Sequence, residues 1–146
     1  MATSNSFLRV EEHIRDEWLE RRFGQKFTKR SVSLRTKGTF EFDAVSPDGD
    51  IVGCISANSG RARQGGLAKT KMNKIRSDIM FLMLSKAQRR LMILTDADLY
   101  AHSVNEQKRG RLPCDIDICH AKLSDEFQAL LSEAQKAASI EIIAEA

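Results

Sequence analysis

The stretch FEFDAVSPDGDIVGCISANSGR, residues 40–61, decides the fold of this chain. Two largely apolar runs, 39–45 and 51–57, flank the sequence Ser-Pro-Asp-Gly-Asp. Proline presets φ and Asp-Gly favours tight turns, so this pattern predicts two strands joined by a hairpin turn. The second run is apolar at nearly every position, which predicts a central strand that is buried on both faces.

The segments before this hairpin predict a helix and an edge strand. Apolar residues recur at spacings of three and four across residues 7–22, with charged residues between them, as in an amphipathic helix that Gly24 would end. Residues 28–37 alternate apolar and polar side chains, which indicates an exposed strand. The apolar positions of the expected helix are Phe7, Val10, Ile14 and Trp18.

The segments after the hairpin predict a long helix over residues 67–88 and a fourth strand over 91–96. Residues 97–111 are polar and compatible with a helix, which Asp96 and Asp98 at the end of the strand can cap. Residues 114–121 alternate as a last strand does. A final helix begins after Ser124, whose hydroxyl can cap it. The expected buried stripe of the long helix contains Met72, Ile75, Ile79, Leu82 and Met83.

The whole chain of 146 residues is predicted to form a single α/β domain over 1–146. Its order, α-β-β-β-α-β followed by a C-terminal strand and helix, predicts a mixed central sheet with flanking helices. No run reaches the roughly 18 apolar residues of a membrane span, and the first residues do not resemble a signal peptide. With only three cysteines, we expect a cytoplasmic protein with reduced thiols and no membrane partner.

This order of elements, with Asp43 in the second strand, resembles the core of the PD-(D/E)XK nuclease superfamily, which has the restriction-endonuclease-like fold. In that family the second strand ends near a metal-binding Asp, and the third strand carries Glu-x-Lys after a hairpin. Ten residues separate Asp43 from Cys54 here, and the resemblance covers roughly residues 7–96. It implies that Asp43 holds the first motif position and that Cys54 and Ser56 hold the Glu and Lys positions.

Cys54 and Ser56 depart from the family pattern in a way that affects catalysis. Two acidic residues would hold Mg²⁺ through oxygen ligands, and the metal and the lysine would assist phosphodiester hydrolysis. A cysteine sulfur is a soft ligand that suits Mg²⁺ poorly, and a serine carries no charge. We therefore expect a catalytically degenerate, pseudoenzyme-like nuclease domain without a cofactor, which binds nucleic acid or assists a partner nuclease subunit.

Relocated residues keep an active enzyme open as the alternative. Glu11 in the first helix offers a second metal ligand beside Asp43, and the long helix offers Lys71, Lys74 and Asp78 on one stripe. A lysine of this helix standing in for Ser56 would give a Mg²⁺-dependent DNA endonuclease. The competing interpretation of the stripe is a solvated helix face with an i,i+4 ion pair.

The charge distribution bears on the choice of partner. Residues 41–60 hold four acids and no base, whereas residues 61–90 hold nine bases and one acid. Glycines and a helix start within this basic block suit contact with a phosphate backbone, and the alternative is a solubilising loop. A protein-interaction module without nucleic acid, for example a homodimer, is the third hypothesis. The expected phosphate-binding residues are Arg61, Arg63, Lys69, Lys71 and Lys74.

Overall fold

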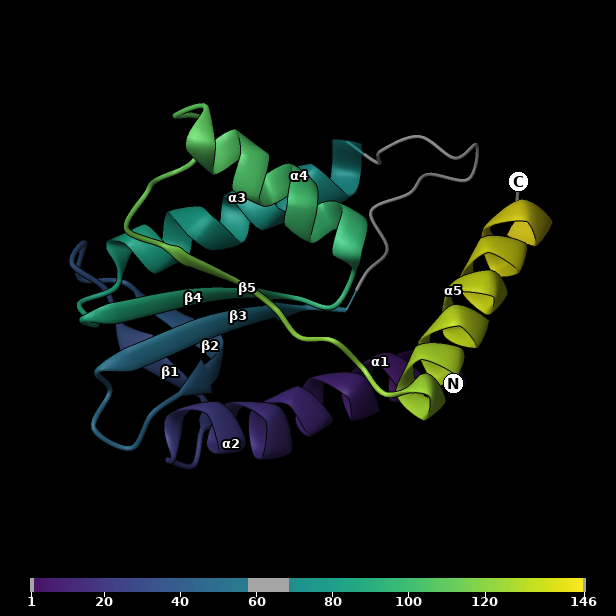
Figure 1. Cartoon of the computed structure of the whole chain (residues 1–146), viewed down its shortest axis with the longest axis horizontal. Coiled ribbons are helices and arrows are strands. Elements are labelled where there is room, and N and C mark those ends of the chain that lie inside the picture. Colours follow the sequence, from purple (N-terminus) through teal and green to yellow (C-terminus); the bar gives the residue numbers. More distant parts are fainter. Residues whose placement is uncertain (1, 58–68, 146) are drawn as a thin grey trace.

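The sheet at the centre of the molecule carries helices on both faces (Figure 1). A computed structural model describes residues 2–57 and 69–145. The sheet has five strands in the order β1-β2-β3-β4-β5, so each strand pairs with its neighbours in the sequence. The strands are β1 (Thr28–Ser33), β2 (Thr39–Val45), β3 (Ile51–Ser56), β4 (Arg89–Leu94) and β5 (Asp117–His120).

The direction of the strands changes at β3. β1, β2 and β3 form an antiparallel meander, whereas β4 and β5 run parallel to β3 and to each other. Parallel neighbours need a crossover connection, and helices supply it between β3 and β4 and between β4 and β5. The expected α/β class with a mixed sheet and flanking helices is therefore confirmed. The helices are α1 (Ala2–His13), a π-helical turn (Ile14–Trp18), α2 (Leu19–Phe23), α3 (Lys69–Leu84), α4 (Ala97–Lys108) and α5 (Asp125–Glu145).

Three helix ends lie where the sequence predicts them. Gly24 adopts a left-handed conformation with φ 69° and ends α2. The Asp96 carboxylate accepts a hydrogen bond of 2.9 Å from the Leu99 amide at the start of α4. The Ser124 hydroxyl accepts a bond of 3.4 Å from the Phe127 amide at the start of α5. The side chains of Asp96 and Ser124 thus satisfy backbone N–H groups that a helix leaves unpaired at its start.

The π-helical turn changes which residues of the first helical segment are buried. Val10, Ile14 and Leu19 are fully buried, whereas Trp18, expected on this face, is only partly buried. A spacing of five between Ile14 and Leu19 fits the wider π-helical turn that connects them. Trp18 packs against the core on the expected face, but Leu19 takes the fully buried position because a regular α-helical period does not hold across this turn.

Two apolar cores lie on the two faces of the sheet. α3 and α4 cover one face, where Phe42, Val52 and Leu82 belong to the core. α1, α2 and their π-helical turn cover the other, where Ala44, Ile55 and other buried side chains pack. Of the helices in the described part of the chain, none is both long enough and apolar enough to cross a bilayer.

The buried stripe of α3 agrees with the prediction at four of its five positions. Met72, Ile75, Ile79 and Leu82 are buried, but Met83 is 45% exposed. The helix also ends at Leu84 rather than at Gln88. The buried arc is centred between Ile75 and Leu82, so it includes Asp78 on one side and leaves Met83 on the other. The orientation of the helix on the sheet, which a periodic pattern does not specify, decides between these two residues.

Candidate functional site

Asp43 lies at a β-bulge in β2. Between the pairs Arg30↔Phe42 and Thr28↔Val45, β2 advances three residues while β1 advances two, so β2 contains one extra residue here. As a result Phe42 packs in the core under α3, whereas Ala44, two residues later, packs in the opposite core. Bulges of this kind re-aim side chains and are frequent beside functional sites.

The bulge coincides with a fork between two strands. The described pairs of β2 with β3 are Ala44↔Gly53 and Val45↔Val52, and the ladder does not continue to Asp43. At this point the Asp43 carboxylate accepts a hydrogen bond of 2.8 Å from the Ile55 amide of β3. The side chain thus satisfies a backbone donor at the fork, which holds the carboxylate in a defined position.

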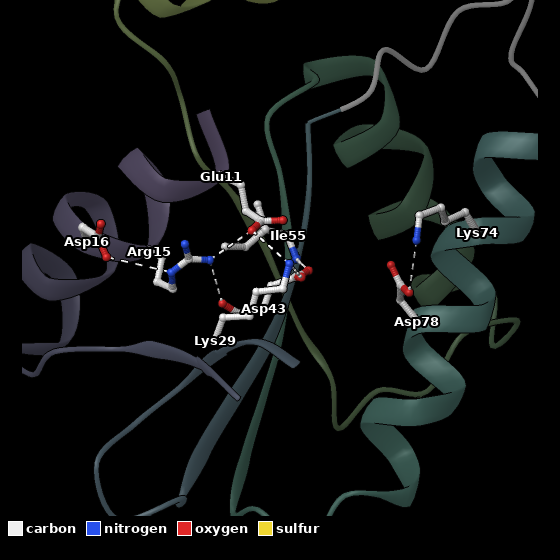
Figure 2. A network of polar contacts seen from close by, with 8 residues as sticks. All are labelled: Glu11, Arg15, Asp16, Lys29, Asp43, Ile55, Lys74 and Asp78. Atoms are coloured by element: carbon white, nitrogen blue, oxygen red, sulfur yellow. Dashed lines mark hydrogen bonds and ion pairs between the residues drawn. The ribbon is translucent and has the colours of Figure 1, made fainter. Parts of the chain in front are cut away.

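Three charged side chains surround Asp43: Glu11 of α1, Arg15 of the π-helical turn and Lys29 of β1 (Figure 2). Arg15 Nη1 lies 3.0 Å from Glu11 Oε2 and donates a bond of 3.1 Å to the Asp43 carbonyl oxygen. Lys29 Nζ lies 3.5 Å from Glu11 Oε2 and 3.9 Å from Asp43 Oδ1. Glu11 and Asp43, expected to share a metal, are therefore brought together around a lysine ammonium group.

Burial controls the acidity of Asp43. It raises the pKa of this carboxyl from 3.8 to about 6, and the Ile55 amide opposes the shift by stabilising the charged form. The negative charges of Glu11 and Asp78 raise the pKa further, while Lys29 lowers it. The effect of Asp78 shows that this α3 carboxylate lies within electrostatic range of the fork.

Cys54 lies within electrostatic range of the Asp43 and Asp78 carboxylates but supplies no carboxylate of its own. It is only 2% exposed, and its pKa is raised by burial and then by the charges of Asp78 and Asp43. The thiol therefore stays protonated, which removes the thiolate character that nucleophiles and metal ligands require. Ser56, two residues further on the same strand, is 8% exposed, and its carbonyl oxygen accepts a bond from the Thr95 amide.

The lysines of α3 lie in two different environments. Lys74 Nζ is 3.7 Å from Asp78 Oδ1, so the expected i,i+4 ion pair is present (Figure 2). Asp78 is nevertheless 9% exposed, and burial raises its pKa while Lys74 opposes the shift. Burial lowers the pKa of Lys71, and the charge of Asp96 opposes that shift. The charges of Lys74 and Asp78 thus influence the groups at the fork. Lys71 instead interacts with Asp96, which follows the end of β4.

The expected phosphate-binding residues lie partly within the described part of the chain. Lys69 is exposed and forms the first residue of α3. Arg61 and Arg63 lie outside the described residues. Of the expected phosphate-binding residues, the structure therefore places Lys69, Lys71 and Lys74 along the first half of α3.

Metal coordination at the fork has few available ligands. Across residues 2–57 and 69–145, no group of three or more His, Cys, Asp or Glu side chains is arranged to hold a metal ion. The fork instead combines two carboxylates, an ammonium group, a guanidinium group and a protonated thiol.

Sequence reasoning missed Lys29 and Arg15 as members of this site. Arg15 follows Glu11 by four residues on a helix, a spacing that predicts their contact. Lys29 has no such local signal, because its position depends on how β1 pairs with the bulged strand.

The chain was also compared with known proteins. No family model, no curated protein and no solved structure matches it significantly.

Proposed function

We propose that this chain is a nuclease-like domain of restriction-endonuclease-like topology that has lost its catalytic metal centre and binds nucleic acid. An antiparallel meander followed by a parallel strand supports this topology, since the PD-(D/E)XK superfamily, which the sequence resembles, has the same order of elements. The observation that carries the proposal is the fork itself. An oriented carboxylate, Asp43, stands beside a buried, protonated Cys54 where the motif requires a second oxygen ligand.

The chemistry at the fork favours loss of cleavage. Mg²⁺ takes hard oxygen ligands in octahedral geometry, and a protonated thiol supplies neither the charge nor the atom type. Ser56 has no positive charge with which to stabilise the negative charge that develops on a phosphate during cleavage. We therefore expect no Mg²⁺-dependent cleavage by the wild-type protein.

The charges of α3 support nucleic-acid binding. Lys69, Lys71, Lys74 and Arg76 lie within its first eight residues, and the helix start adds a positive dipole end. Two of these bases lie beside buried carboxylates, Lys74 at 3.7 Å from Asp78 and Arg76 at 3.8 Å from Glu106, so part of the charge of α3 is offset. Such a surface neutralises phosphates without reading bases.

Fluorescence anisotropy with labelled duplex and single-stranded oligonucleotides, over a range of salt concentrations, tests the proposal. We expect affinity to fall steeply with salt for the wild type. Lys69→Glu should weaken binding and reduce the slope of log K against log salt by about 0.9 for one lost duplex phosphate contact. Lys86→Glu, an equal charge change at an exposed site beyond α3, is the matched control. Binding that is absent, or insensitive to salt, would contradict the proposal.

A second candidate is an active Mg²⁺ nuclease with relocated residues, and the position of Asp78 favours it. This buried carboxylate acts electrostatically on both Asp43 and Cys54, and Lys74 accompanies it. Plasmid cleavage with Mg²⁺ and with Mn²⁺ separates the two candidates. Cleavage that Asp43→Asn and Asp78→Asn both abolish, but the exposed Glu133→Gln does not, would establish the active enzyme and overturn our first proposal.

A further inference from the structure

Lys29 occupies a particular place relative to the bulge. It lies in β1 between the two residues whose pairing shifts register, so it faces the extra residue of β2. Its side chain reaches carboxylates of two different elements, Glu11 of α1 and Asp43 of β2, at 3.5 Å and 3.9 Å. A positive group already lies between the two acids.

Arg15 has a different role in the same cluster. Its side chain is 12% exposed, and it bonds both to Glu11 and to the Asp43 carbonyl oxygen. It therefore joins the helix to the backbone of β2 and holds Glu11 in place. The Lys29 side chain is 38% exposed and contacts the oxygens of two carboxylates, so solvent can reach it and it can move away.

Two bases already balance the two carboxylates of this cluster. Glu11 and Asp43 contribute two negative charges when ionised, and Arg15 and Lys29 contribute two positive charges. A third acid, Asp16, lies 3.8 Å from Arg15, but its side chain is 63% exposed, so solvent screens its charge. A divalent cation entering this cluster would face two positive groups within a few ångströms, which is unfavourable in a partly buried site. Removing one of these groups would leave a net negative pair of oxygen ligands.

We propose that the Glu11–Asp43 pair is a cation-binding site whose resident cation is the Lys29 ammonium group, and that this group excludes hard divalent cations. This inference concerns the same site as the proposed function and explains how the site is kept closed to metal. Two carboxylates from different elements, with Glu11 fixed by Arg15 and Asp43 fixed by the Ile55 amide, form a preorganised pair of oxygen ligands.

Replacing Lys29 tests the proposal directly. Lys29→Met keeps the length of the apolar stem and removes the charge, while Lys29→Arg keeps the charge. Mn²⁺ binding, followed by electron paramagnetic resonance of the free ion, should be at least about tenfold tighter for Lys29→Met than for the wild type, because one repulsive unit charge is removed. Lys29→Arg and the exposed control Lys26→Met should bind Mn²⁺ as the wild type does.

A double variant assigns any new binding to these carboxylates. Adding Glu11→Gln to Lys29→Met should return Mn²⁺ affinity to the wild-type level. The melting temperature of Lys29→Met should rise with Mn²⁺, and that of the wild type should stay nearly constant. If Lys29→Met does not fold, as judged by circular dichroism, Lys29→Gln takes its place.

Two results would overturn the inference. One is equal Mn²⁺ affinity of Lys29→Met and the wild type. The other is gained affinity that survives Glu11→Gln. The Mn²⁺ titrations contain no nucleic acid, so a negative result would leave the proposed nucleic-acid binding untouched. Conversely, an absence of salt-dependent nucleic-acid binding would not affect the inference about Lys29.

Discussion

Asp43→Asn should stabilise the protein at neutral and alkaline pH. In the folded protein, burial raises the pKa of Asp43 from 3.8 to about 6, so ionising this residue costs free energy. An asparagine carries no charge at any pH. Its amide oxygen can still accept the hydrogen bond from the Ile55 amide.

The size and direction of this change in stability follow from the shift in the pKa of Asp43. Between pH 3.8 and about 6 the unfolded chain has lost the Asp43 proton while the folded chain retains it, so the free energy of unfolding falls as the pH rises. The shift is about two pKa units, which corresponds to about 3 kcal/mol. Below pH 3.8 both states are protonated and this cost disappears.

Urea denaturation of the wild type and of Asp43→Asn at several pH values from 3.5 to 8 measures the difference. We expect the asparagine variant to gain about 3 kcal/mol relative to the wild type over this range, with most of the gain between pH 4 and 6. Asp50→Asn, in the exposed hairpin turn, is the matched control and should show no comparable gain. A pH-independent difference between Asp43→Asn and the wild type would refute the reasoning.

Other variants test the packing and the fork. Leu82→Ala should lower the free energy of unfolding by about 2–5 kcal/mol, and Met83→Ala by about 0.5 kcal/mol or less, since only the first side chain is buried; equal losses in urea denaturation would contradict the observed orientation of α3. In the native protein a thiol reagent should label the exposed Cys114 quickly, and the buried Cys54 and Cys119 only on unfolding; rapid labelling of Cys54, located by peptide mapping, would show that the fork is open. Made together with Lys29→Met, the substitutions Cys54→Glu and Ser56→Lys should lower the stability, and Mg²⁺ should raise the melting temperature of this variant; a folded variant whose melting temperature does not change with Mg²⁺ would show that positions 54 and 56 do not share a site with Asp43.

Much of the secondary structure was determined by local sequence. The Pro-Asp-Gly-Asp turn and its flanking apolar runs predicted β2 and β3 because turn chemistry and strand alternation act over a few residues. The apolar period of α3 and the caps at Asp96 and Ser124 were readable for the same reason. The i,i+4 contact between Lys74 and Asp78 follows from the geometry of a helix alone.

The arrangement of the candidate site depended on tertiary structure. The bulge at Asp43 arises from how β2 pairs with β1, and it turns one carboxylate toward the Ile55 amide and Lys29. Lys29 is 18 residues from Glu11 in the chain, and no periodic pattern relates them. The burial of Asp78 depends on the rotation of α3 against the sheet. Pairing register and helix rotation are set by contacts between distant segments, so they decide which charges meet at the fork, whereas the sequence by itself determined only the elements that carry them.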